Sequence, residues 1–144
     1  MTPNLQLVGR FSRFACWGQY RLQRRQSVPG PAALARKAIL DTLRPTLEKE
    51  LKQKIQFQVH QLAIEGDWAF LFAAPQQPNG KAPDYGKTRY REAVRAGAFD
   101  NGVAALFRRT RRSWRLVTHV LGATDVPWMD WPRRFGAPKQ LFTP

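Results

Sequence analysis

The feature that most restricts the fold is a pair of apolar runs in the second half of the chain. Residues 103–107 (VAALF) and 114–121 (WRLVTHVL) are separated by six residues, four of which are arginine. Runs of this length, rich in β-branched and aromatic residues, predict two antiparallel strands joined by a short connection. We therefore expect a β-hairpin with five basic side chains at its tip: Arg108, Arg109, Arg111, Arg112 and Arg115.

Strict alternation along both strands would give this hairpin one apolar face. That face would contain Val103, Ala105 and Phe107 from the first strand, and Trp114, Leu116, Thr118 and Val120 from the second. An apolar face needs a cover, so the hairpin is expected to belong to a larger sheet packed against another element.

A long amphipathic helix is predicted near the start of the folded region. Between residues 32 and about 54 an apolar residue recurs at every fourth position, which is the spacing of one buried helical stripe. Pro45 lies inside the pattern, where it removes one backbone hydrogen bond and crowds the preceding turn. We therefore expect a kink or a brief break there. The stripe consists of Ala35, Ile39, Leu43, Leu47 and Leu51.

A second hairpin is predicted after the helix. Apolar residues occupy odd positions from 55 to 59, whereas Leu62 and Ile64 occupy even positions. A β-bulge near His60 or Gln61 would account for this change, as would partial burial of both faces. The sequence Glu-Gly-Asp at 65–67 predicts a turn. The strand that follows places Trp68, Phe70 and Phe72 on one face.

The remaining segments predict shorter elements. Residues 75–87 are rich in proline and glycine and predict an exposed loop. Thr88 can cap a short helix over 89–96, with Gly97 as its stop. Residues 122–142 predict a short helix at 128–135 within an apolar flap that closes the core. The predicted fold class is therefore α+β, with a kinked N-terminal helix packed on a curled four-stranded antiparallel meander.

Length and charge predict one domain with a basic tail. The chain has 144 residues and a formal net charge of +14. Proline and glycine at 29–31 separate residues 1–31, which are basic and free of acidic residues, from a single α+β domain at 32–144. The tail is expected to be flexible, a targeting segment or a misannotated extension. The one cysteine, Cys16, cannot form an internal disulfide, and no apolar run predicts a membrane span or a secretory signal, so we expect a soluble chain.

Several short strings resemble a family of small uncharacterised bacterial α+β proteins, many of them exported. The strings are RKAILDTL at 36–43, GDWAF at 66–70, VAAL at 103–106, WRLV at 114–117 and GATDV at 122–126. The order of helix and meander is also similar to cystatin-like and nuclear-transport-factor-2-like domains. This resemblance covers residues 36–142. It implies that fold and a periplasmic location, and it transfers no catalytic residue.

Two basic regions are candidate binding surfaces. The five arginines of the predicted hairpin tip could hold phosphate groups, since a β-ribbon with guanidinium groups can approach a nucleic-acid backbone. The alternative is a solvated tip that discourages edge aggregation. In the tail, arginines between residues 10 and 25 alternate with aromatic residues, which suits stacking on bases or an anionic membrane surface. Targeting or simple disorder are the alternatives there.

Tryptophan and histidine are the other residue types with possible functional roles. Trp68, Trp114, Trp128 and Trp131 could line a ligand pocket, although core packing is the default interpretation of tryptophans at such positions. His60, His119 and Asp125 could form a general base or part of a metal site, but no nucleophile accompanies them at a recognisable spacing. Asp125 and Asp130 flank Trp128, where turn or cap roles compete with acid–base chemistry.

The sequence predicts a non-enzymatic binding or accessory domain with a basic surface and with no cofactor or metal. Its partner would be an acidic protein, an anionic polymer or a small apolar ligand. Two other functions stay open. One is nucleic-acid or polyanion binding through the arginine hairpin and the tail, and the other is an enzyme with a pocket on a nuclear-transport-factor-2-like fold.

Overall fold

The structure is a computed structural model and describes residues 30–143. Nearly all of the predicted tail, including Cys16 and the aromatic and basic residues between 10 and 25, lies outside these residues. The helices are α2 (Pro31–Leu51), α3 (Arg91–Arg95) and α4 (Trp131–Phe135). The strands are β1 (Gln56–Glu65), β2 (Trp68–Gln76), β3 (Val103–Thr110) and β4 (Ser113–Leu121). Three 3₁₀ turns are η1 (Tyr85–Lys87), η2 (Pro127–Asp130) and η3 (Lys139–Phe142).

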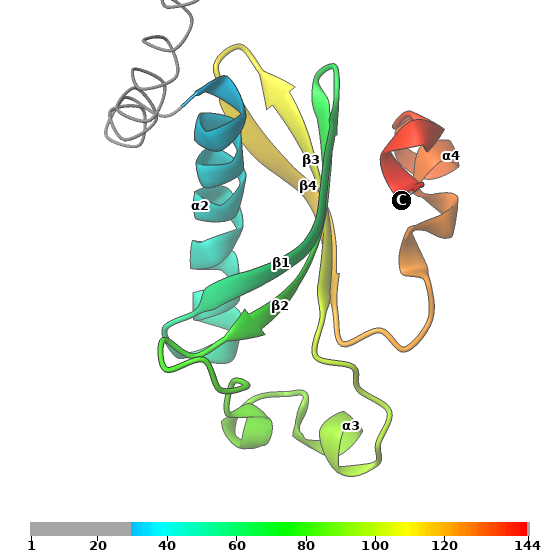
Figure 1. The fold of residues 1–144 in the computed structure, drawn as a ribbon. Coiled ribbons are helices and arrows are strands. Elements are labelled where there is room, and N and C mark those ends of the chain that lie inside the picture. The colour runs from blue at the N-terminus through cyan, green and yellow to red at the C-terminus, as the bar shows by residue number, and fades with distance from the viewer. Residues whose placement is uncertain (1–29, 144) are drawn as a thin grey trace, which may run out of the picture. The chain divides into compact units, whose positions relative to one another are not determined.

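One antiparallel sheet organises the described residues. Its strands follow the order β1-β2-β3-β4, so each strand pairs with the next along the chain. Helix α2 covers one face of the sheet, and η2, α4 and η3 lie on the other face (Figure 1). The α+β class and the helix followed by a four-stranded antiparallel meander are thus confirmed. We call residues 127–142 the C-terminal flap.

Helix α2 packs on the sheet through the predicted stripe. Ile39, Leu43, Leu47 and Leu51 are fully buried, while Ala35 is half-buried. The helix runs through Pro45 without interruption, so the break allowed for there does not occur. Buried residues on both sides of Pro45 hold the two halves against the same sheet face. The helix ends at Leu51, earlier than predicted, because Lys52 has a φ of 59°.

The change of parity in β1 comes from the bulge that the sequence predicted. Val59 pairs with Ala73 and Gln61 pairs with Phe72, so His60 is the extra residue. The bulge returns Leu62 to the face that carries Phe57 and Val59, and all three pack in the core beneath α2. One extra residue therefore keeps Phe57, Val59 and Leu62 toward the helix, while Ala63 packs on the flap side.

A second bulge makes one prediction wrong. Leu106 pairs with Thr118 and Phe107 pairs with Leu116, which leaves Val117 unpaired in β4. Trp114 and Leu116 therefore face α2, whereas Val120 packs on the opposite side, against the C-terminal flap. The four residues expected on one face of this strand are divided between two.

The two central strands are buried on both faces. Ala69, Leu71 and Ala73 of β2 join the core beneath α2. Trp68, Phe70 and Phe72 share the other face, as predicted, and pack against the flap. The second core consists of Phe70, Ala104, Leu106, Trp131, Ala137 and Leu141.

The segment between β2 and β3 is more ordered than its composition suggested. Strand β2 continues to Gln76, and Tyr85 is buried in η1, so the prediction of an exposed loop is wrong for these parts. Burial raises the pKa of Tyr85, whose hydroxyl donates to Asn101 Oδ1. Helix α3 begins two residues later than predicted. Its N-cap is Tyr90 and not Thr88, whose Oγ1 accepts a hydrogen bond from Tyr90 N at 3.1 Å. Gly97 follows the helix with a φ of 72°.

No helix among residues 30–143 has both the length and the apolar character to span a bilayer.

Candidate functional site

The turn of the β3–β4 hairpin is shorter than predicted. Pairing continues to Thr110 and Ser113, so the turn itself holds only Arg111 and Arg112. Arg108, Arg109 and Arg115 lie within the strands because the ladder extends through the arginine run. We call the five arginines, together with Trp68 and Trp114, the hairpin end.

On the flap side of the sheet, an arginine lies over a tryptophan. Arg108 pairs in register with Trp68 of β2, and its guanidinium carbon is 4.9 Å from the indole ring centre. Arg115 is directly opposite Arg108 on the neighbouring strand. The stacking holds the Arg108 guanidinium in place beside a second cation, which raises the local positive potential.

On the helix side, Arg109 lies over Trp114 at 5.4 Å from the ring centre. It also links the hairpin end to the turn between β1 and β2. Arg109 N donates to Asp67 O at 2.7 Å, and Arg109 Nη2 donates to Asp67 Oδ1 at 3.1 Å. The charge of Arg109 is therefore partly compensated within the fold.

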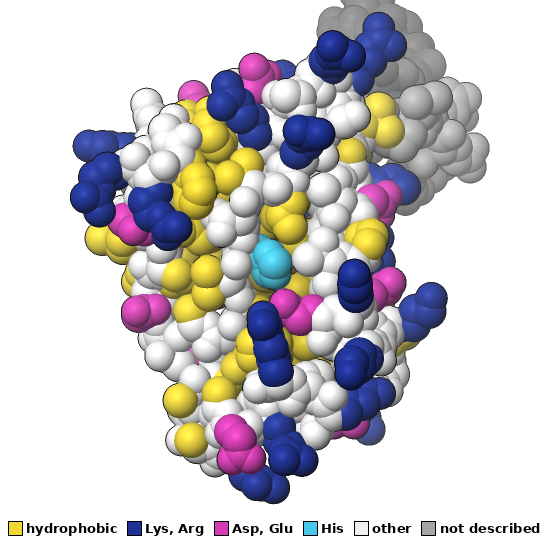
Figure 2. All heavy atoms as spheres, turned by 180° about the vertical axis from the view of Figure 1, so that it is seen from behind, with side chains coloured by type: hydrophobic (Ala, Val, Ile, Leu, Met, Phe, Trp, Pro, Cys, Tyr) yellow, Lys and Arg dark blue, Asp and Glu magenta, His cyan; other side chains and the backbone are white. Residues whose placement is uncertain are grey.

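The other four arginines of the hairpin end are not compensated in this way. Among residues 30–143, no carboxylate lies within 4.0 Å of the guanidinium groups of Arg108, Arg111, Arg112 or Arg115. All four residues are exposed. Figure 2 shows Lys and Arg side chains spread over one face of the molecule, with Asp and Glu side chains among them. The unpaired cations of the hairpin end therefore lie on the flap side, at Arg108 and Arg115, and in the turn, at Arg111 and Arg112.

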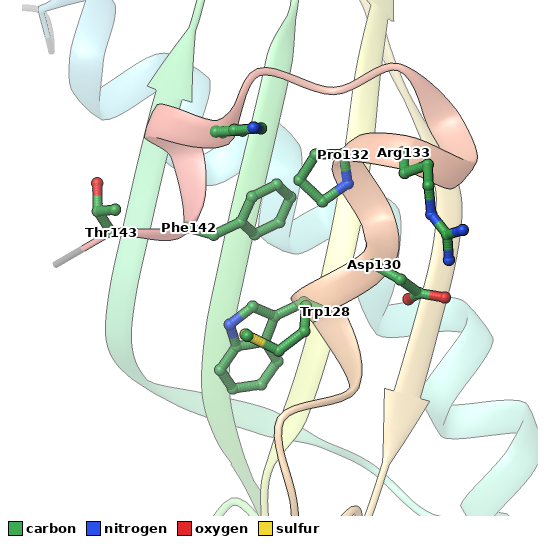
Figure 3. Close-up of a pocket in the computed structure, with 8 residues that line it drawn as sticks. Trp128, Asp130, Pro132, Arg133, Phe142 and Thr143 are labelled. Atoms are coloured by element: carbon green, nitrogen blue, oxygen red, sulfur yellow. The ribbon is translucent and has the colours of Figure 1, made fainter.

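The C-terminal flap carries a shallow hollow of about 480 Å³. Figure 3 shows the rings of Phe142 and Pro132 beside the indole of Trp128, while Asp130 and Arg133 extend away from them. The walls are mostly apolar, and Met129 is 76% exposed at the hollow. The lining residues are Trp128, Met129, Asp130, Pro132, Arg133, Lys139, Phe142 and Thr143.

The structure separates the two flap tryptophans that the sequence grouped together. Trp128 is half-buried and lines the hollow, and its ring packs in a tilted arrangement against Phe70 and Phe72, with 5.2 and 5.5 Å between ring centres. Trp131 is only 1% exposed, and its ring is packed in the second core beside Phe70. Trp131 is therefore a core residue. Trp128 is the flap tryptophan whose side chain is accessible to a ligand.

The histidines and Asp125 do not converge. His60 lies 5.8 Å from the ring of Phe72, on the flap side of the sheet. His119 pairs in register with Ala105, on the helix side, and its Nε2 is 3.9 Å from Glu50 Oε1. Asp125 is exposed beside a small hollow near Phe72. Within residues 30–143 no three His, Cys, Asp or Glu side chains are close enough to hold a metal ion.

Sequence reasoning missed a polar cluster around Glu50 of α2. Its carboxylate accepts hydrogen bonds from Tyr90 Oη at 2.8 Å and from Arg89 Nη2 at 2.9 Å. Burial raises the pKa of Tyr90. The one signal available was the position of Glu50, three residues after Leu47, at the border of the buried helical stripe. The cluster ties α2 to the segment before α3.

Comparison of the chain with protein-family models, with curated proteins and with solved structures found no match in any of the three.

Proposed function

We propose that this chain is a non-enzymatic binding domain whose hairpin end holds an anionic polymer. The observation that carries the proposal is the set of four exposed arginines without a carboxylate partner in the described part of the chain: Arg108, Arg111, Arg112 and Arg115. A planar guanidinium can bind two oxygens of one phosphate or sulfate group. Several such groups along a ribbon suit a polymer with repeated anionic groups.

Preorganisation supports the same function. Stacking on Trp68 restricts the Arg108 guanidinium, and the salt bridge to Asp67 restricts that of Arg109. Ordering a long side chain on binding costs about 0.5–1.5 kcal/mol. The Arg108 side chain, already held by the fold, avoids part of this cost on binding.

The test is the salt dependence of binding to two probes, a single-stranded oligonucleotide and a sulfated polysaccharide, each followed by fluorescence anisotropy. Replacing the four unpaired arginines with Gln should flatten the slope of log Kd against log salt by about 0.7–1 per lost phosphate contact. Preference for one probe would distinguish phosphate from sulfate polymers.

A matched control removes the same charge elsewhere. Lys49, Lys52, Lys54 and Lys81 are exposed lysines outside the hairpin end, and their joint replacement with Gln should lower affinity less and keep most of the slope. Equal slopes for the two variants, or binding that does not depend on salt, would remove the hairpin end from this role.

We also propose that the domain is cystatin-like or nuclear-transport-factor-2-like and exported, as the resemblance of residues 36–142 implies. What supports this is the order of elements, a long helix followed by a four-strand meander with the helix on one sheet face. Mass spectrometry of the mature N-terminus, after expression in a bacterial host, tests export. A full-length chain retained inside the cells would contradict it.

A further inference from the structure

We infer a second binding site, independent of the hairpin end, in the hollow of the C-terminal flap. The geometry points to a small apolar carboxylate, such as an aliphatic or aromatic acid. The hollow's volume of about 480 Å³ lies within the range of about 300–1,000 Å³ typical of small-molecule sites.

The walls of the hollow favour an apolar body. Trp128, Met129, Pro132 and Phe142 supply most of its surface, and the rings of Trp128 and Phe142 lie near each other in it (Figure 3). Met129 is the most exposed large hydrophobic residue of the described region. Burial of apolar surface stabilises a complex, so covering these side chains provides the driving force.

The charges of the hollow favour an anionic head group. Arg133 and Lys139 contribute to its lining, and neither forms an ion pair within residues 30–143. The one carboxylate of the lining, Asp130, lies 4.0 Å from Arg134, so its charge is partly compensated outside the hollow. The net charge of the side chains that line the hollow is therefore positive. Arg133, which extends away from the rings toward the rim, and Lys139 would hold a carboxylate there, while the apolar part of the ligand covers Trp128, Met129 and Phe142.

A concave site on the flap suits one molecule better than a flat surface such as a membrane. The hollow is floored by Trp128, which itself rests on Phe70 and Phe72 of the sheet. Its base is therefore held by the second core and does not need to form on binding. The side chains that would contact the ligand's head group, Arg133 and Lys139, are exposed, and they can be replaced without disturbing that core.

Calorimetric titration of the full chain with decanoate, below its micelle concentration, tests the site. Decanol, which has a similar chain and no charge, is the matched ligand. We expect one decanoate per chain, bound at least tenfold more tightly than decanol, and a rise of the melting temperature with decanoate concentration. Equal affinity for the two ligands, or no saturable binding, would overturn the proposal.

Variants locate the binding. Replacement of Arg133 and Lys139 with Gln should weaken decanoate binding about tenfold and leave decanol binding unchanged, whereas Lys81→Gln should change neither. Met129→Asp should weaken both ligands, and its folding can be checked by melting temperature. Binding that survives both of these flap variants would place the ligand elsewhere. Binding to vesicles of anionic lipid, but not to monomeric decanoate, would assign the flap to a membrane and reject the small-molecule site.

Discussion

At the residue scale, Gly122 is the glycine of residues 30–143 with the least room for a side chain. It follows β4 with a φ of 86°, and a Cβ added there would lie 2.2 Å from Phe99 Cε2. Phe99 in turn packs against Tyr85, with 4.5 Å between ring centres. Two features therefore require glycine at position 122. One is the left-handed backbone conformation, and the other is the Phe99 ring, which occupies the space that a side chain would need.

Gly122→Ala should lower the free energy of unfolding by about 2–6 kcal/mol, because a left-handed alanine and an overpacked contact each cost about 1–3 kcal/mol. Denaturant unfolding measures the loss. Gly80→Ala is the control, because Gly80 has a φ of 88° but no atom within 4 Å of an added Cβ. It should cost about 1 kcal/mol. Equal losses for the two variants would show that Phe99 moves aside.

At the scale of the element, helix α2 shows how packing outweighs local preference. Pro45 is exposed inside a 21-residue helix, yet the buried stripe continues on both sides of it. Proline in a helix interior costs about 3 kcal/mol relative to alanine. The burial of Ile39, Leu43, Leu47 and Leu51 against the sheet offsets this cost.

Pro45→Ala should therefore raise the free energy of unfolding by about 1–2 kcal/mol. The restored hydrogen bond to Asp41 O and the relieved crowding stabilise the helix, while the freer unfolded chain offsets part of the gain. Thermal and denaturant melts measure the change. Lys49→Ala, on the exposed side of the same helix, should stay within about 0.5 kcal/mol. A loss of stability in Pro45→Ala would mean that the proline itself shapes the fit of α2 on the sheet.

At the scale of the whole molecule, much of the described fold could be predicted because its signals are local. The helical stripe, the turn at 65–67 and the bulge at His60 all follow from the spacing of nearby residues. The bulge at Val117 could not be predicted, since it is set by pairing with β3 rather than by the sequence of β4 alone. For the same reason, the stacking of Arg108 on Trp68 and the contacts of Glu50 depend on strands and loops that meet only after folding.

Because strands β2 and β3 contribute to both cores, we expect the described domain to unfold cooperatively. Leu43 lies in the core beneath α2 and Trp131 in the core beneath the flap, but both cores use side chains of the same two strands. Leu43→Ala and Trp131→Ala should each lower the free energy of unfolding by about 2–5 kcal/mol and keep one unfolding transition. Circular dichroism and tryptophan fluorescence should give the same midpoint. Separate midpoints in Trp131→Ala would show that the flap unfolds by itself.

The two bulges affect whether copies of this chain can associate through the edges of the sheet. They lie in β1 and β4, the two strands at the margins of the sheet, and each interrupts the regular row of amide and carbonyl groups that a fifth strand would need. Arg115 adds a charge beside the second interruption. A concentrated solution of this domain should therefore resist growth into fibrils by strand addition, even though its central strands are apolar on both sides.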